Sequence, residues 1–133
     1  MKHKATKDTE EESNVLSKEI IGAAIEVHRS LGPGLLESIY EECLAHELAL
    51  RHLTFRRQVA LPLIYKGIRL DAGYRLDLLV ESRIVVEVKA VEHVLPVHEM
   101  QVLTYLRLTR VWLGLLLNFH VGALREGIRR IVN

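Results

Sequence analysis

Two acidic residues near the middle of the chain could share a cation. In a β-hairpin centred on Ser82, Asp77 falls opposite Glu87, and by the same count Arg75 falls opposite Lys89. Because side chains alternate between the two faces of a strand, all four project from one side. Opposed Cβ atoms lie about 4.5–5.5 Å apart, so the two carboxylates repel each other unless one is protonated or a cation bridges them. The pair predicts a Mg²⁺ or Mn²⁺ site, which needs only one or two protein carboxylates.

A simpler interpretation of the same hairpin stays open. Carboxylates on a strand face are commonly just solvated, and Arg75 and Lys89 could neutralise them as surface ion pairs of little energetic value. The pairing also depends on the register, since a slip of one residue would move every side chain to the other face. The opposite face is predicted to be buried, because it carries Leu76, Leu78, Val86 and Val88.

Two predicted helices carry further candidates. Glu37 and Tyr40 are three residues apart and therefore share a helix face. Glu37 could supply another carboxylate to the cation, or it could only favour the helix N-terminus electrostatically. Gln101 and Tyr105 lie one turn apart on a later helix, with His98 one turn before Gln101. This face could hydrogen-bond phosphates or orient catalytic groups; alternatively, Tyr105 is an aromatic at the edge of the core and Gln101 a solvated neighbour.

The elements that position these residues follow from periodicity. Apolar residues at helical spacing predict a first helix capped by Ser17, which the sequence Gly-Pro-Gly at 32–34 ends. Lys66-Gly67 marks a turn within a region of alternating residues that begins at Thr54. The later elements are predicted as strands at 73–80 and 84–90, a helix at 96–108, a buried strand at 111–117 and a short helix at 124–131. The order predicts a mixed α/β domain.

Length and composition set the outer limits. The chain has 133 residues, 49% of them hydrophobic, and a net charge of +1, which suits one globular domain and excludes a polybasic nucleic-acid wrap. We expect residues 1–13 to form a flexible charged tail and residues 14–133 a single domain. With Cys43 as the one cysteine, an iron–sulfur cluster and a multi-cysteine zinc site are excluded. No pair of histidines has a zinc spacing, and no signal peptide or membrane span is visible, which predicts a cytoplasmic protein.

The motifs together resemble the PD-(D/E)XK nuclease superfamily, in particular its RecB-type branch. That branch carries a glutamate on an early helix, then an aspartate, Glu-x-Lys and Gln-x-x-x-Tyr in this order. The matches here are Glu37, Asp77, Glu87-Val88-Lys89 and Gln101 to Tyr105. The segments 28–40 and 65–77 also resemble the small proteins of the GxxExxY family. The resemblance covers residues 16–132.

This resemblance implies a restriction-endonuclease-like core with a central mixed β-sheet flanked by helices. It implies that Asp77 and Glu87 bind Mg²⁺ or Mn²⁺, with the Val88 carbonyl as a further ligand and Glu37 contributing directly or through water. Lys89 would assist the attacking water and stabilise charge on the phosphate. The substrate would be positioned by Gln101, Tyr105, Tyr40 and His98.

The predicted function is therefore metal-dependent hydrolysis of nucleic acid, with DNA favoured over RNA. A non-catalytic nucleic-acid or protein binding module that retains the nuclease fold is the alternative, and a structural homo-oligomer is a third. Some RecB-type nucleases add a four-cysteine iron–sulfur cluster, which Cys43 alone cannot form. Larger relatives also carry DNA-binding domains, so substrate selection here would need a homodimer, an unidentified targeting partner or a local groove.

Overall fold

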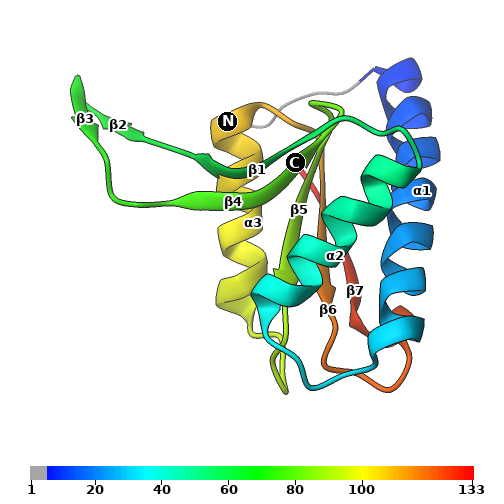
Figure 1. The fold of residues 1–133 in the computed structure, drawn as a ribbon. Helices are drawn as coiled ribbons and strands as arrows, with labels where there is room; N and C mark the ends of the chain where they lie inside the picture. Colours follow the sequence, from blue (N-terminus) through cyan, green and yellow to red (C-terminus); the bar gives the residue numbers. More distant parts are fainter. Residues whose placement is uncertain (1–5) are drawn as a thin grey trace.

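A central β-sheet lies between helices on both of its faces (Figure 1). The computed structural model describes residues 6–133. In chain order, the elements are α1 (Lys7–Leu31), α2 (Glu37–Leu50), β1 (Phe55–Ala60), β2 (Leu63–Tyr65), β3 (Ile68–Leu70), β4 (Arg75–Val80), β5 (Ile84–Lys89), α3 (Pro96–Thr109), β6 (Leu113–Asn118), the 3₁₀ helix η1 (Leu124–Gly127) and β7 (Ile128–Val132). This arrangement confirms the predicted mixed α/β fold.

The main sheet has the strand order β1-β4-β5-β6-β7. Neighbouring strands are antiparallel except β5 and β6, which are parallel and joined by α3. A parallel pair needs such a crossover, because the chain must return to the end of the sheet where the first strand began. All six residues of β6 are buried, as the apolar run at 111–117 predicts for a central strand covered on both faces.

The two faces of the sheet pack against different helices. Figure 1 shows α1 and α2 on one side and α3 on the other. The larger core, on the α1 and α2 side, includes Ile20, Leu44, Val86 and Leu115. The smaller core, on the α3 side, includes Leu79, Val85, Val102 and Leu116. Burial of apolar surface on both faces holds the sheet as a rigid frame for residues at its end.

Strands β2 and β3 form a separate two-stranded hairpin, which we call the arm (residues 63–70). The arm projects from the ends of β1 and β4, away from the body of the molecule (Figure 1). Its turn is at Lys66 and Gly67, as predicted, and both residues have positive φ, 47° and 84°. Such turns match the twist of the two strands they connect.

The N-terminus differs from the prediction. Helix α1 begins at Lys7, and the Thr6 side chain caps it by accepting the Thr9 N–H at 3.1 Å. The predicted flexible tail is therefore wrong for residues 7–13, which are helical; residues 1–5 lie outside the described part of the chain. Ser17 is buried inside the helix rather than capping it. The acidic residues of the first turn suit the positive end of the helix dipole, which explains why a charged segment extends the helix.

The C-terminus differs as well. The predicted final helix is wrong: one short 3₁₀ helix is followed by β7, which pairs antiparallel with β6. Leu124, Ile128 and Ile131 are spaced in a way that fits a helical stripe, but Ile128 and Ile131 are also β-branched. Pairing with the free edge of the buried strand β6 satisfies the backbone polar groups and decides the outcome.

Candidate active site

The register of the β4–β5 hairpin is the predicted one. Leu78 pairs with Val86 and Val80 with Ile84, so the next position places Asp77 opposite Glu87. Backbone pairing between the two strands ends at Leu78 and Val86. The two acidic residues therefore lie where the strands begin to separate.

Beyond that point, the two carboxylates take over the role of backbone carbonyls. The Asp77 N–H donates to Glu87 Oε2 at 2.7 Å, and the Val88 N–H donates to Asp77 Oδ2 at 2.8 Å. Each carboxylate is thus held by the main chain of the neighbouring strand. This arrangement fixes two acidic groups side by side without freedom to move apart, which is the preorganisation that a catalytic site needs.

Strand β1 is irregular at the same level of the sheet. Gln58 has φ of 50°, in the left-handed region, and the regular pairing of β1 with β4 is interrupted there. Its side-chain amide donates to Asp77 Oδ1 at 3.2 Å and to Glu41 Oε1 at 2.7 Å. Strained backbone that persists in a native structure is held by its surroundings and clusters at functional sites.

Glu41, on α2, belongs to this cluster, and the sequence analysis missed it. It is buried, with a relative exposure of 6%, and its Oε2 accepts from Arg57 Nη2 at 2.9 Å. Its sequence signal is its place among the buried residues of α2, between Tyr40 and Leu44, where an acidic residue is unexpected. Arg57 and Gln58 hold the Glu41 carboxylate in this position, and Gln58 also contacts Asp77.

Burial and neighbouring negative charge raise the pKa values of Asp77 and Glu87. Burial raises the pKa of Asp77 to about 6, with the Glu41 charge adding to the effect. Burial, followed by the charge of Asp77, raises the pKa of Glu87 to about 8. Lys89 opposes both shifts, so its ammonium group lies close enough to stabilise the charged forms. The site favours the binding of a proton or a cation.

Two further side chains fix the chain just beyond β5. Glu37 Oε2 accepts the Ala90 N–H at 3.0 Å, which places this predicted residue next to Lys89. Asn118, at the end of β6, accepts the Val91 N–H at 3.0 Å and donates to the Val91 carbonyl at 2.8 Å. Asn118 was not predicted as a site residue from the sequence, although a polar residue directly after the apolar run 111–117 was a usable signal.

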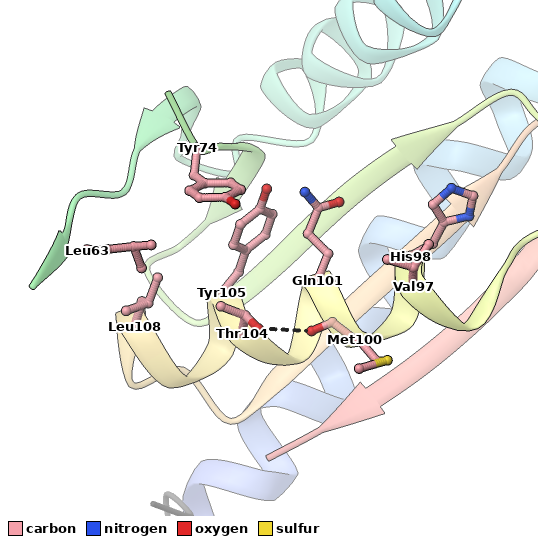
Figure 2. A pocket seen from close by; sticks show the side chains of 9 residues that line it. All are labelled: Leu63, Tyr74, Val97, His98, Met100, Gln101, Thr104, Tyr105 and Leu108. Carbon is pink, nitrogen blue, oxygen red and sulfur yellow. Dashed lines mark hydrogen bonds between the residues drawn. The ribbon is translucent and has the colours of Figure 1, made fainter. Parts of the chain in front are cut away.

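Gln101, Tyr105 and His98 line a cavity of about 340 Å³ between α3 and the base of the arm (Figure 2). Tyr74 closes one side of it, and the Tyr105 ring points toward Tyr74. Burial, then the charges of Glu87 and Asp77, raise the pKa of Tyr105 to about 12. Tyr105 therefore lines the cavity and also lies within electrostatic range of the carboxylates.

His98 contributes to this cavity in a restricted way. Its Nδ1 accepts the Leu95 N–H at 2.9 Å and so caps the start of α3. The ring is held in one orientation by this bond, and Nε2 is the nitrogen that remains for a ligand.

Tyr40 lies away from the other predicted site residues. It is fully buried, and its hydroxyl donates to the Gly32 carbonyl at 2.5 Å and accepts the Leu35 N–H at 3.1 Å. Its ring stacks on Phe119 with centroids 4.6 Å apart. Tyr40 thus holds the loop before α2 in place. Its buried position does not support the predicted contact with substrate.

The chemistry of the donors fits a hard divalent cation. Asp77 and Glu87 offer carboxylate oxygens, and Mg²⁺ is commonly bound by one or two carboxylates together with waters and substrate phosphates. A cation between them would offset the cost of burying their negative charges, which is the main cause of their raised pKa values. Within residues 6–133, no three His, Cys, Asp or Glu side chains are arranged to hold a metal ion by themselves.

A comparison with protein families agrees with the fold. The family model of the PD-(D/E)XK nuclease superfamily matches residues 14–131, and the chain belongs to this superfamily. Neither the comparison with curated proteins nor the comparison with solved structures finds a match. Among residues 6–133, no helix has both the length and the apolar character to cross a membrane.

Proposed function

We propose that this protein hydrolyses phosphodiester bonds in DNA, with a Mg²⁺ or Mn²⁺ ion held by Asp77 and Glu87. One observation carries the proposal: the two carboxylates are fixed side by side, each by a backbone N–H of the neighbouring strand. The charge of Lys89 favours the ionised form of both. Membership of a nuclease superfamily supports the same reaction class. The Val88 carbonyl and Glu37, directly or through water, would complete the metal ligands.

The residues of the chain divide the work of the reaction. When bound, the cation would neutralise phosphate charge and lower the pKa of a bound water. The Lys89 ammonium would orient the attacking water and stabilise the negative charge that develops on the phosphate. Glu41 would act as a positioning residue, because its contact with Gln58 holds the amide that in turn contacts Asp77. Gln101, Tyr105 and His98 would hold the substrate beside the carboxylates.

Cleavage of labelled DNA tests the proposal. Single-stranded and duplex substrates are incubated with Mg²⁺ or Mn²⁺ and the wild type, Asp77→Asn or Lys89→Met. We expect each substitution to reduce cleavage by about 10²-fold or more, since each removes a charge that acts on the transition state. Glu126→Gln, an exposed change in η1, is the matched control and should cleave like the wild type. Cleavage that survives both site substitutions would overturn the assignment.

Metal binding separates the alternatives. Titration calorimetry should show Mn²⁺ binding to the wild type and a large loss with Asp77→Asn. A non-catalytic binding module that retains the nuclease fold would instead bind nucleic acid without metal and without turnover. Within the superfamily, we further propose the RecB-type branch, on the basis of Glu37, Asp77, Glu87-Val88-Lys89 and the Gln101–Tyr105 motif. We also propose the GxxExxY family, on the basis of the segments 28–40 and 65–77.

A further inference from the structure

The arm exposes an apolar face that the rest of the fold does not cover. In its register, Leu63 pairs with Leu70 and Tyr65 with Ile68, so these four side chains share one face. Tyr65, Ile68 and Leu70 have relative exposures of 61%, 59% and 45%. A two-stranded hairpin does not form a core of its own, so this face is built to contact something else.

That face runs directly into the cavity beside the carboxylates. Leu63, at the base of the arm, lines the cavity together with Tyr74 and Leu108, and Figure 2 shows the three side chains turned toward the same space. Most of the lining is apolar or aromatic, and Gln101 and Thr104 supply polar groups at its α3 wall. Small-molecule ligands are commonly bound in largely apolar cavities of roughly 300–1,000 Å³ that carry a few polar groups.

The charge of this region points to a polyanion. Residues 55–75 contain five basic residues, Arg56, Arg57, Lys66, Arg69 and Arg75, and one acidic residue, Asp71. Arg57 is already paired with Glu41 of α2, so four of the five remain for a ligand or for Asp71. The whole chain, by contrast, has 18 basic and 17 acidic residues. Arg69 pairs with Asp71, but both side chains are more than half exposed, so a phosphate can compete for the arginine.

We propose that the cavity captures one unpaired nucleobase of a single-stranded nucleic acid and that the arm guides the adjoining strand. This proposal rests on the proposed nuclease function and names its substrate class. The base would stack against the Tyr74 ring, and Gln101 would hydrogen-bond its edge. The phosphate next to that base would then lie on the carboxylate side of Tyr105.

A single strand suits this site better than a duplex. Bases in a duplex are stacked on their neighbours, so their faces are not free to contact Tyr74 or the apolar face of the arm. Proteins that bind single strands combine basic residues along the backbone path with exposed aromatic side chains, and this region offers both. A second copy of the chain covering the arm is the competing occupant, and the test below distinguishes it.

Binding without metal tests the proposal separately from catalysis. In the presence of EDTA, we compare oligothymidylate with an abasic oligomer of the same length and charge, using the wild type and Tyr74→Ala. We expect Tyr74→Ala to weaken binding of oligothymidylate about tenfold, because stacking on an aromatic side chain contributes that much per base. Binding of the abasic oligomer should not change, since it has no base to stack.

Two more variants guard against a trivial loss of structure. Tyr74→Phe keeps the ring and should bind oligothymidylate like the wild type. Thr104→Trp fills the cavity from an exposed position on α3 and should cause the same selective loss as Tyr74→Ala. A fluorescent adenine analogue in the strand should be quenched by the wild type but not by Thr104→Trp. Thermal melting checks that each variant is folded.

The possible failures are distinct. If the abasic oligomer loses as much affinity as oligothymidylate, or if neither loses any, the base site is wrong. If sedimentation shows a dimer that Thr104→Trp dissociates, with no base-dependent binding, the arm covers a second copy instead. If base-dependent binding is found but the wild type cleaves nothing with Mg²⁺ or Mn²⁺, the base site stands and the proposed nuclease function fails.

Discussion

The two faces of the sheet serve different purposes. On the α1 and α2 side, the core is continuous, and even the Tyr40 hydroxyl is used to hold backbone groups. On the α3 side, the core is smaller, and the Tyr105 side chain borders a cavity of about 340 Å³. The α1 and α2 side supplies most of the packing, and α2 also contributes Glu37 and Glu41 to the carboxylate cluster, whereas the α3 side leaves room for a ligand.

This difference predicts which substitutions lower the free energy of unfolding and which act on ligand binding or catalysis instead. Apolar burial on the α1 and α2 side holds β4 and β5 in place, and the separation of these strands at Asp77 and Glu87 then positions the acids. Residues of the α3 side contribute less packing and face the proposed substrate. Substitutions of the same type on the two faces should therefore have opposite consequences.

A pair of leucine truncations should show the largest contrast. Leu44 is fully buried on α2, and Leu44→Ala should lower the free energy of unfolding by about 2–5 kcal/mol through lost burial and a cavity. Leu108 lines the cavity on α3 and is 40% exposed, so Leu108→Ala should cost less than about 1 kcal/mol. Urea unfolding measures both. Equal losses would contradict the division of roles between the faces.

The same division explains which site residues the sequence could predict. Turn position and alternation fix a hairpin register, so Asp77 and Glu87 were paired correctly from the sequence. Glu41 was missed because helical spacing shows which face a residue shares but not which strand that face contacts. Tyr40 shares the motif with Glu37, yet its side chain points into the core, and spacing alone cannot reveal that.

The fold was predictable in its middle and less so at its ends. The central elements have strong periodic patterns, and their packing agrees with those patterns. At the N-terminus, Ser17 was an acceptable cap by residue type, but the charged segment before it is helical back to Lys7, and Thr6 is the cap. At the C-terminus, the free edge of β6 determined that residues 128–132 form a strand.

Two tyrosine substitutions, one on each side of the sheet, should separate an effect on stability from an effect on cleavage. Tyr40→Phe leaves the Gly32 carbonyl and the Leu35 N–H without their partner, so it should lower the free energy of unfolding by about 1–3 kcal/mol. Cleavage and single-strand binding by the folded variant should not change. Tyr105→Phe should do the reverse, reducing cleavage with little loss of stability. The assignment fails if Tyr40→Phe slows cleavage under conditions where it is fully folded.

The acidic cluster predicts how stability depends on pH without metal. The pKa of Asp77 is raised from 3.8 to about 6 and that of Glu87 from 4.5 to about 8, so the folded protein keeps protons that the unfolded chain releases. The free energy of unfolding should therefore be highest below about pH 4 for these groups and decrease as the pH rises toward 8, by on the order of several kcal/mol.

Urea unfolding in EDTA at several pH values measures this dependence. The double variant Asp77→Asn and Glu87→Gln should flatten it, because neither side chain then exchanges a proton in this range. Glu126→Gln, which is exposed in η1, should leave the slope as it is in the wild type. If the free energy of unfolding of the double variant depends on pH as steeply as that of the wild type, the groups that titrate are not Asp77 and Glu87.

The smallest effect on stability is expected in the arm. Arg69 and Asp71 form an ion pair of 3.2 Å between two exposed side chains, so Arg69→Ala should change the free energy of unfolding by less than about 0.5 kcal/mol. Its effect on nucleic-acid binding should be larger, because an arginine that contacts phosphate also releases counterions. The salt dependence of oligothymidylate binding should lose about one unit of slope. Arg125→Ala, exposed in η1, is the matched control, and an equal change there would mean that the arm has no special part in binding.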